Sequence, residues 1–268
     1  MVPEIANPYF TEIYSGIQKV TENRDYVSFL YETVNTQRVI HALIMRGADG
    51  IIFDAKYRGD SKEDLDVAGI PYVQTNTPAQ YPDKNSVKID IFKATLDTIA
   101  YLKSMGHTVI GLITYKEKDH PIRERYRAFC HYAREEGIHH FEDFISLQSF
   151  RTHKSTDGFN GMKDLLERNR GITAVIALND LTAIGAVTAA VSMGYRVPED
   201  ISIVGFDNTE IAKYCNPPLT TVNIPTVRQG EIATNMLLEL IENRQAEPYS
   251  VELHPELIIR KTVSRAKP

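Results

Sequence analysis

Several polar or aromatic side chains stand where an apolar run gives way to a helical pattern. Three carboxylates and one amide follow such runs directly: Asp90, Asn179, Asp180 and Asp207. Arg125 begins another helical pattern, and Tyr9 and Phe10 open the first one. Guanidinium, carboxylate and amide groups bind hydroxyls and ring nitrogens, and aromatic faces stack on a ring. These residue types therefore favour a binding site for a polyhydroxylated or heterocyclic small molecule.

Each of these residues also has a purely structural interpretation. Asp90 and Asp180 are residues of the type that caps a helix, and Asp207 suits a turn. Arg125 stands among other basic residues, and Phe10 fits a buried helix face. The local sequence leaves both interpretations open at every position.

The sequence lacks the motifs of the common catalytic and cofactor-binding sites. It has no Gly-x-Gly, no phosphate-binding loop, no serine-nucleophile elbow and no HExxH or CxxC motif. Its histidines do not fall at metal-ligand spacings, and no nucleophile stands with an orienting base. We therefore expect no catalytic residue, no metal and no cofactor. The two cysteines, Cys130 and Cys215, predict reduced thiols in a cytoplasmic protein.

The elements that must position these residues alternate between two periodicities. Short apolar runs, typical of buried strands, are separated by segments with helical spacing, such as Phe10, Ile13 and Ile17. The expected strands are 50–53, 70–73, 87–91, 109–113, 144–147, 174–178, 201–206 and 257–259, and 26–31 is a further short apolar run. This alternation predicts βαβ units and parallel sheet. It leaves open whether the chain forms one barrel or two doubly wound halves.

Length and charge narrow the class of protein further. The chain has 268 residues and a formal net charge of −5, with a pI of about 5.9. An acidic surface does not attract a phosphate backbone, so the chain by itself is not expected to bind DNA. No apolar run approaches the roughly 18 residues of a membrane span. The first residues lack the basic and apolar regions of a signal peptide.

Longer segments carry a more specific pattern. They are Val2–Phe10, Gly47–Ile52, Gly106–Gly111 and, above all, Ala174–Thr221, which contains ALND, VPEDISIVGFDN and PPLTT. Together these segments resemble the effector-binding core of the lactose/galactose repressor family over essentially the whole chain. Glu247–Pro255 is similar to the purine repressor branch of that family.

The resemblance implies an α/β, periplasmic-binding-protein-like fold. Two doubly wound parallel-sheet subdomains would be joined by three crossovers, with an effector bound between them. The N-terminal subdomain would hold residues 1–107 and 224–253, and the C-terminal subdomain residues 108–223 and 254–268. The family's helix-turn-helix headpiece is expected to be absent from this chain, as is most of the strand that precedes Pro3.

The resemblance also matches seven residues to effector-contacting positions of the family. They are Tyr9, Phe10, Asp90, Arg125, Phe150, Asn179 and Asp207. Ala128 replaces the usual glycine of the arginine motif, and Tyr115–Asp119 replaces the usual Pro/Gly turn. Because this loop would border the cleft, the identity of the effector is not copied from the sugar-binding or purine-binding members.

We thus expect the effector-sensing core of a cytoplasmic, homodimeric bacterial transcriptional regulator. Its effector would be a sugar, a sugar phosphate or a purine-like metabolite, and it would reach operator DNA only through the headpiece. Two alternatives stay open at this point. A periplasmic sugar-binding protein of a transporter shares the fold, and a small-molecule enzyme can be built on a doubly wound sheet.

Overall fold

The chain folds as two compact units. The computed structural model describes residues 1–32, 36–54, 65–66, 69–80, 85–115, 124–148, 154–169, 171–243 and 245–267. Unit 1 comprises Met1–Asp90 and Pro225–His254, and unit 2 comprises Ile91–Ile224 and Pro255–Pro268. The chain therefore passes from one unit to the other three times, the number of crossovers that the resemblance implies.

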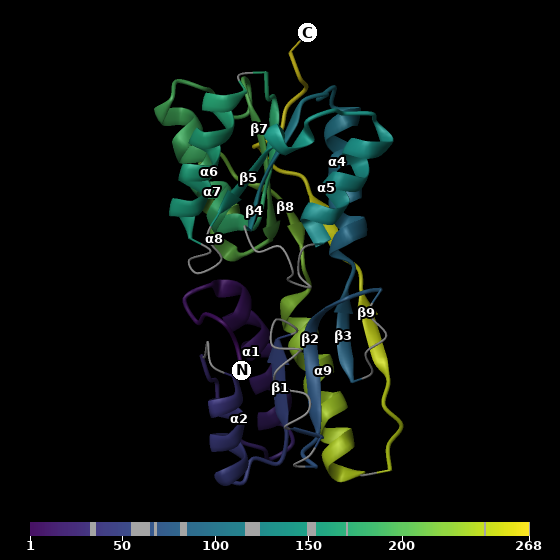
Figure 1. Cartoon of the computed structure of the whole chain (residues 1–268). Coiled ribbons are helices and arrows are strands. Elements are labelled where there is room, and N and C mark those ends of the chain that lie inside the picture. Colours follow the sequence, from purple (N-terminus) through teal and green to yellow (C-terminus); the bar gives the residue numbers. More distant parts are fainter. Residues whose placement is uncertain are drawn as a thin grey trace. The chain divides into compact units, whose positions relative to one another are not determined.

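Within the described residues, unit 1 is built on a four-stranded sheet in the order β1-β2-β3-β9, with every neighbouring pair parallel (Figure 1). Helix α2 covers one face, where Ile40 packs with Phe53 and Tyr72. Helix α9 covers the other face, where Met236 packs with Val73. The elements are β1 (Ile51–Asp54), β2 (Tyr72–Pro78), β3 (Ser86–Ile89), β9 (Ser250–Leu253), α1 (Pro8–Glu22), α2 (Thr36–Met45) and α9 (Thr226–Glu242).

Helix α1 begins as the sequence predicts. The Asn7 side chain accepts a hydrogen bond from the Tyr9 amide at 3.1 Å, and Pro8 occupies the first turn. The helix then packs closely on α9. A Cβ on Gly16 would lie 2.1 Å from the Val227 carbonyl oxygen, so the two backbones approach closer than any other residue type would allow.

In the part of the chain that the structure describes, unit 2 is built on a six-stranded sheet in the order β10-β8-β7-β6-β4-β5. Neighbouring strands are parallel except for β10, which is antiparallel to β8. The strand predicted at 257–259 is therefore present as β10, but it runs antiparallel to its neighbour, whereas the sequence predicts a parallel sheet. The strands are β4 (Ile110–Tyr115), β5 (Ile145–Gln148), β6 (Ala174–Ala177), β7 (Ser202–Asp207), β8 (Thr220–Asn223) and β10 (Glu256–Ile258).

Helices cover both faces of the unit 2 sheet, with α4 and α5 on one side and α6 and α7 on the other (Figure 1). Adjacent strand residues alternate between the two cores: Leu112 faces α4 and α5, whereas Ile113 faces α6 and α7. This explains why the strands are continuous apolar runs. The helices are α4 (Ile91–Ser104), α5 (Glu124–Glu135), η2 (Phe141–Phe144), α6 (Ser155–Arg168), α7 (Asp180–Ser192) and α8 (Glu210–Tyr214).

The first crossover lies earlier than the predicted subdomain boundary at residue 107. Helix α4 packs on α5 and β10 of unit 2, and its Ile99 and Leu102 belong to the core that contains Phe129. This apolar face places residues 91–107 with unit 2. The other two crossovers fall within a residue or two of the predicted positions.

Helices α6 and α7 meet through a reciprocal pair of glycines. A Cβ on Gly158 would lie 1.8 Å from the Thr182 carbonyl oxygen, and a Cβ on Gly185 would lie 1.8 Å from the Ser155 carbonyl oxygen. In both cases the obstacle is backbone, which cannot rotate away as a flexible side chain can. The contact therefore fixes the start of α7 against α6.

We predict that Gly185→Ala will destabilise the protein by about 3 kcal/mol or more, at the upper end of the cost of overpacking. Thr188→Ala, an exposed position on the same helix, is the control and should change stability by less than about 0.5 kcal/mol. Urea unfolding followed by circular dichroism measures both. A Gly185→Ala variant as stable as the control would refute the close contact.

A buried amide in unit 1 gives a second prediction. The Gln74 side chain is fully buried in β2, and neither its Nε2 nor its Oε1 has a hydrogen-bond partner among the described residues. Burying a polar group without a partner costs about 1–3 kcal/mol. Gln74→Leu should therefore raise the free energy of unfolding by an amount in that range. An unchanged or lower value would mean that the amide is satisfied in solution.

Candidate functional site

The candidate residues of unit 2 converge on the carboxyl ends of two neighbouring strands. Asn179 follows β6 by two residues, Asp207 ends β7, and these strands are adjacent in the sheet. Both side chains are almost completely buried. Loops and helix N-termini converge at this edge of a parallel sheet, which is where ligands bind in open α/β folds.

Arg125 is brought to the same strand end from α5. It lies in the first turn of that helix and is buried. Its guanidinium carbon lies 4.2 Å from the centroid of the Phe206 ring, a cation–π stacking distance. Because Phe206 directly precedes Asp207, the stack sets a planar cation beside the strand end that carries the candidate carboxylate.

Asn179 caps the start of helix α7, a role for which the sequence favoured its neighbour Asp180. It is the N-cap of α7. Its side-chain oxygen accepts a hydrogen bond from the Thr182 backbone N–H at 2.9 Å, and its backbone N–H donates to the Thr182 hydroxyl at 2.9 Å. Asp180 is the first residue of the helix rather than its cap. The expectation that Asp180 caps α7 is wrong, because the reciprocal bonds with Thr182 already satisfy the helix start.

Asp180 instead organises the turn that carries Asp207. Its carboxylate is fully buried and accepts hydrogen bonds from the Thr209 amide at 2.7 Å, the Thr209 hydroxyl at 2.9 Å and the Thr221 hydroxyl at 2.5 Å. Burial raises the pKa of Asp180 to about 6, although these hydrogen bonds and Arg260 act in the opposite direction. Apart from the residue type, nothing in the local sequence indicates this role.

The turn itself has an unusual backbone. Asp207 and Asn208 both have positive φ, 104° and 58°, in a region that residues other than glycine seldom adopt. The Asn208 amide group donates to Asn223 at 2.9 Å, and its oxygen accepts from Arg260. Side chains on both sides therefore hold Asp207 in a conformation that the backbone alone does not favour.

Unit 1 places its candidate residues at the corresponding edge of its own sheet. The Tyr9 hydroxyl donates to the Asn76 side-chain oxygen, which also accepts from Gln229 Nε2 at 2.9 Å. Asn76 Nδ2 in turn donates to the Asp54 carboxylate. Asn76 lies at an irregularity of the β2–β3 register and has a φ of 58°. The structure thus adds a polar cluster to Tyr9 that the sequence did not identify.

The other candidates of unit 1 are Phe10, the chain neighbour of Tyr9, and Asp90. The Phe10 ring packs edge-on against Tyr9, with centroids 5.1 Å apart, and both residues are buried. Asp90 directly follows β3 and is partly buried. Asp54 follows the same rule as Asp90, since it ends β1. Extending that rule to the run 50–53 would have identified Asp54 from the sequence.

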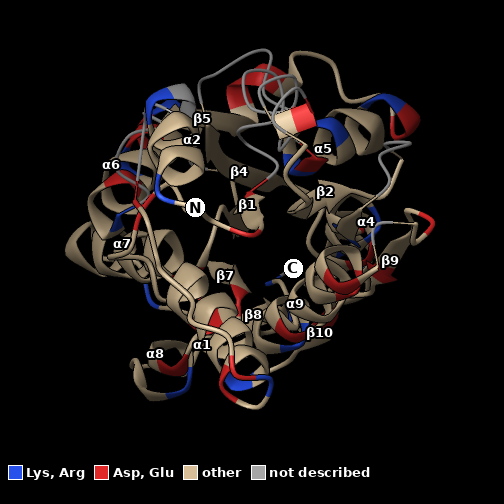
Figure 2. Cartoon of the chain, turned by 90° about the horizontal axis from the view of Figure 1, so that it is seen from below, with Lys and Arg blue, Asp and Glu red and all other residues tan. Residues whose placement is uncertain are grey.

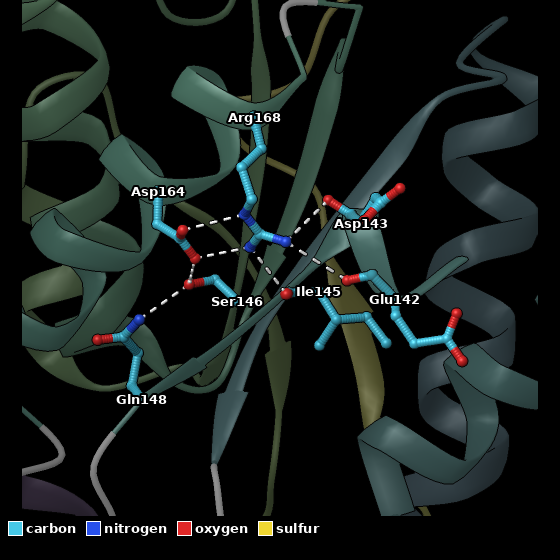
Figure 3. A network of polar contacts seen from close by, with 7 residues as sticks. All are labelled: Glu142, Asp143, Ile145, Ser146, Gln148, Asp164 and Arg168. Atoms are coloured by element: carbon cyan, nitrogen blue, oxygen red, sulfur yellow. Dashed lines mark hydrogen bonds and ion pairs between the residues drawn. The ribbon is translucent and has the colours of Figure 1, made fainter. Parts of the chain in front are cut away.

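Phe150 lies outside the described residues, but its flanking elements are firmly tied together. Arg168 of α6 donates to the Asp164 carboxylate at 2.6 and 3.0 Å and to the Ile145 carbonyl at 2.9 Å (Figure 3). Asp164 also accepts from the Ser146 hydroxyl at 2.6 Å. This network joins β5 to α6, the two elements between which Phe150 falls.

Other kinds of site find no support in the described residues. No group of three or more His, Cys, Asp or Glu side chains among them is arranged to hold a metal ion. Over the same residues, no helix is long and apolar enough to cross a membrane. Acidic and basic residues are interspersed along the elements (Figure 2). Both cysteines are free thiols.

Comparison with known proteins places the chain in a family. The model of the periplasmic binding protein-like domain matches residues 99–263. The HTH-type transcriptional repressor PurR of Pasteurella multocida is 32% identical over 262 residues, which cover 96% of this chain and 78% of the repressor.

Solved structures agree with this assignment. A complex of the transcriptional regulator CelR with cellobiose is 27% identical, has a TM-score of 0.86 and covers 96% of this chain and 80% of that one. A LacI family transcriptional regulator from Enterococcus faecium with bound ribose is 26% identical, has a TM-score of 0.87 and covers 99% and 98% of the two chains.

The chain belongs to the lactose/galactose repressor (LacI/GalR) family of transcriptional regulators and corresponds to their effector-binding core. It has the periplasmic-binding-protein-like fold, and its function is that of an effector-sensing domain. The relatives are regulators, so the comparisons do not support a transport binding protein. They are not enzymes either.

The raised pKa of Asp180 predicts a distinctive pH dependence of stability. A folded-state pKa of about 6, above the ordinary value of 3.8, means that the folded protein holds this proton more tightly than the unfolded chain. The resulting stabilisation is complete below about pH 3.8 and is lost as the pH rises through about 6. Asp180→Asn removes this titration, so wild type should gain stability relative to the variant between pH 6.5 and 4.5.

Asp200 is the control, because its pKa is shifted in the opposite direction to that of Asp180. Arg196 and Lys267 hold the pKa of this half-buried carboxyl well below its usual range, so its contribution is present above the ordinary pKa and is lost as the pH falls. Urea unfolding of wild type, Asp180→Asn and Asp200→Asn across this pH range measures both. A difference between wild type and Asp180→Asn that does not change with pH would contradict the shifted titration.

Proposed function

We propose that the chain senses a sugar or a related metabolite through Tyr9, Phe10, Asp90, Arg125, Phe150, Asn179 and Asp207. The observation that carries the proposal is the stack of Arg125 on Phe206, next to Asp207. The guanidinium of Arg125 would supply hydrogen-bond donors to the hydroxyls of such a ligand, and the carboxylate of Asp207 would supply an acceptor. The cellobiose and ribose bound by two relatives are ligands of this chemistry. Sugar phosphates and purine-like metabolites carry compatible groups.

The regulatory output follows from differential binding. A ligand shifts a conformational equilibrium only to the extent that it binds one state more tightly than the other. Because the proposed contacts come from both units, an effector would favour the state in which all of them are made at once. In the proposed full regulator, a homodimer acting in the cytoplasm, this change would control operator binding by a helix-turn-helix headpiece.

The proposal predicts that Arg125 dominates the affinity. A panel of ribose, cellobiose, ribose 5-phosphate and purine bases, screened by thermal shift, identifies a ligand whose Kd is then measured by calorimetry. Arg125→Ala should weaken that Kd by roughly 10–100-fold, because hydrogen bonds to a charged group are worth about 1.5–3 kcal/mol. Arg125→Lys keeps the charge but loses the planar fork, and it should also bind more weakly than wild type.

Arg134→Ala is the matched control, because Arg134 lies in the last turn of the same helix and is exposed. It should leave the Kd unchanged. Circular dichroism of all three variants separates loss of binding from loss of fold. A folded Arg125→Ala protein that binds the ligand as wild type does would show that the site is elsewhere.

A further inference from the structure

A polar cluster in unit 1 contains one carboxylate and two amides that the proposed effector contacts do not include. These groups are Asp54, Asn76 and Gln229, and the Tyr9 hydroxyl is joined to them. Asp54 is 3% exposed, and Gln229 is 0% exposed. Because buried polar groups find their hydrogen bonds within the protein, what each member can donate or accept determines the direction of every bond in the cluster.

Asn76 is the centre of this cluster. Its Nδ2 donates to the Asp54 carboxylate, and its Oδ1 accepts from the Tyr9 hydroxyl and, at 2.9 Å, from Gln229 Nε2. The φ of 58° at Asn76 lies in a region that asparagine adopts more readily than most residues. One side chain of β2 therefore links the neighbouring strand β1, which ends at Asp54, to helices α1 and α9.

Asp54 fixes the direction of the bonds. An ionised carboxylate accepts hydrogen bonds and cannot donate them. The Asn76 amide must therefore turn its Nδ2 toward Asp54, because the reversed amide would place Oδ1 against a carboxylate oxygen, one acceptor against another. With Nδ2 on the side of Asp54, Oδ1 faces Tyr9 and Gln229, and both of these must donate to it.

The Gln229 amide does not choose this direction. Its Oε1 is buried and has no hydrogen-bond partner among the described residues. If the Asn76 amide were reversed, Gln229 would turn over to accept from it, and Nε2 would take the place of the unpaired oxygen. Gln229 thus leaves one polar atom unpaired in either direction, so the carboxylate of Asp54 is the group that decides.

The direction of the bonds determines what the Tyr9 hydroxyl offers to other groups. A phenol has a single proton to donate, and its oxygen also accepts. The proton of Tyr9 goes to Asn76, so any further partner of the Tyr9 oxygen must donate to it. A hydroxyl or an N–H group meets this condition, whereas an ionised phosphate, a carboxylate or a carbonyl oxygen does not.

We propose that Asp54 is a positioning residue that makes the Tyr9 oxygen a hydrogen-bond acceptor toward the effector. Asp54 acts through Asn76. The inference rests on the proposed function, in which Tyr9 contacts the effector, and it narrows the effector's chemistry. The group that meets Tyr9 is a hydroxyl or an N–H, and a sugar phosphate would have to place its phosphate elsewhere.

Neutron diffraction from crystals of the ligand-free protein in D2O tests the direction of the bonds without any effector. We expect a deuteron between the Tyr9 oxygen and Asn76 Oδ1, and the deuterated Nδ2 of Asn76 on the side of Asp54. A deuteron carried by the Asp54 carboxyl group, or an Asn76 Nδ2 turned toward Tyr9, would overturn the proposal.

Asp54→Asn tests whether Asp54 is the cause. An amide at that position can donate as well as accept, so the Asn76 amide should be reversed in part or all of the molecules of this variant. Asp49→Asn is the matched control, because Asp49 precedes the same strand and is exposed, and it should keep the wild-type direction. An unchanged direction in Asp54→Asn would show that another group sets it.

Binding of D-ribose analogues tests the consequence for the effector. For each non-anomeric hydroxyl, calorimetry gives the Kd of the deoxy analogue and of the deoxyfluoro analogue, whose fluorine cannot donate. The hydroxyl that meets Tyr9 is the one whose removal weakens binding to wild type but not to Tyr9→Phe. At that position, the deoxyfluoro analogue should bind about fivefold or more weakly than ribose, and as weakly as the deoxy analogue.

A deoxyfluoro analogue that binds there as tightly as ribose would overturn the proposal, because the Tyr9 hydroxyl would then be the donor. In Asp54→Asn, the difference in Kd between ribose and this analogue should shrink about threefold, whereas Asp49→Asn should keep it. A protein that binds no ribose would count against ribose as the effector in the proposed function, while the neutron maps would still decide whether Asp54 sets the direction of the bonds.

Discussion

The candidate site of unit 2 depends on one buried carboxylate. Asp180 is fully removed from solvent, and within the described residues its carboxylate accepts three hydrogen bonds, from Thr209 and Thr221. These bonds tie the start of α7 to the turn after β7 and to the neighbouring strand β8. Two consecutive residues with positive φ in that turn cost on the order of 1–3 kcal/mol each unless the surroundings hold them. Asp180, with Arg260 on the other side, is what holds them.

Several other features of unit 2 follow from this arrangement. Position 205 is glycine because a Cβ there would lie 2.5 Å from the Asp180 carboxylate. The glycine contact between α6 and α7 fixes the helix that carries Asp180. Phe206, immediately before the turn, offers its ring to Arg125. Core packing, helix capping and a buried carboxylate therefore act together on the strand end that carries Phe206, on which Arg125 stacks, and Asp207.

Much of this fold could be predicted from the sequence, because strands buried on both faces are continuous apolar runs and helices carry a regular spacing. Asn7 and Pro8 predicted the start of α1. The polar residues after each apolar run predicted the edge of the sheet where the strands have their carboxyl ends. The direction of β10 could not be predicted, since an apolar run is the same in either direction. The first crossover was misplaced because only tertiary packing assigns the apolar face of α4 to unit 2.

Some residues of the candidate site could likewise be predicted from the sequence, and others could not. Residues at or just after the end of a strand, such as Asp207 and Asp90, were found by a local rule. Asn76 and Gln229 were not, because an irregular register in β2 and a distant helix bring them to Tyr9. The role of Asp180 was also missed, since its partners Thr209 and Thr221 are far from it in the chain. Contacts between residues that are far apart in the chain depend on the fold and cannot be predicted from the local sequence.

The most direct test of this account is hydrogen exchange at the Thr209 amide in the ligand-free protein. If the Asp180 carboxylate holds the turn before an effector binds, this amide should exchange at least a hundredfold more slowly than an unstructured amide in wild type, by the roughly 3 kcal/mol of a buried charge-assisted bond. It should lose most of that protection in Asp180→Ala while the strands of the sheet stay protected. A Thr209 amide that exchanges freely in the folded wild-type protein would contradict the central claim.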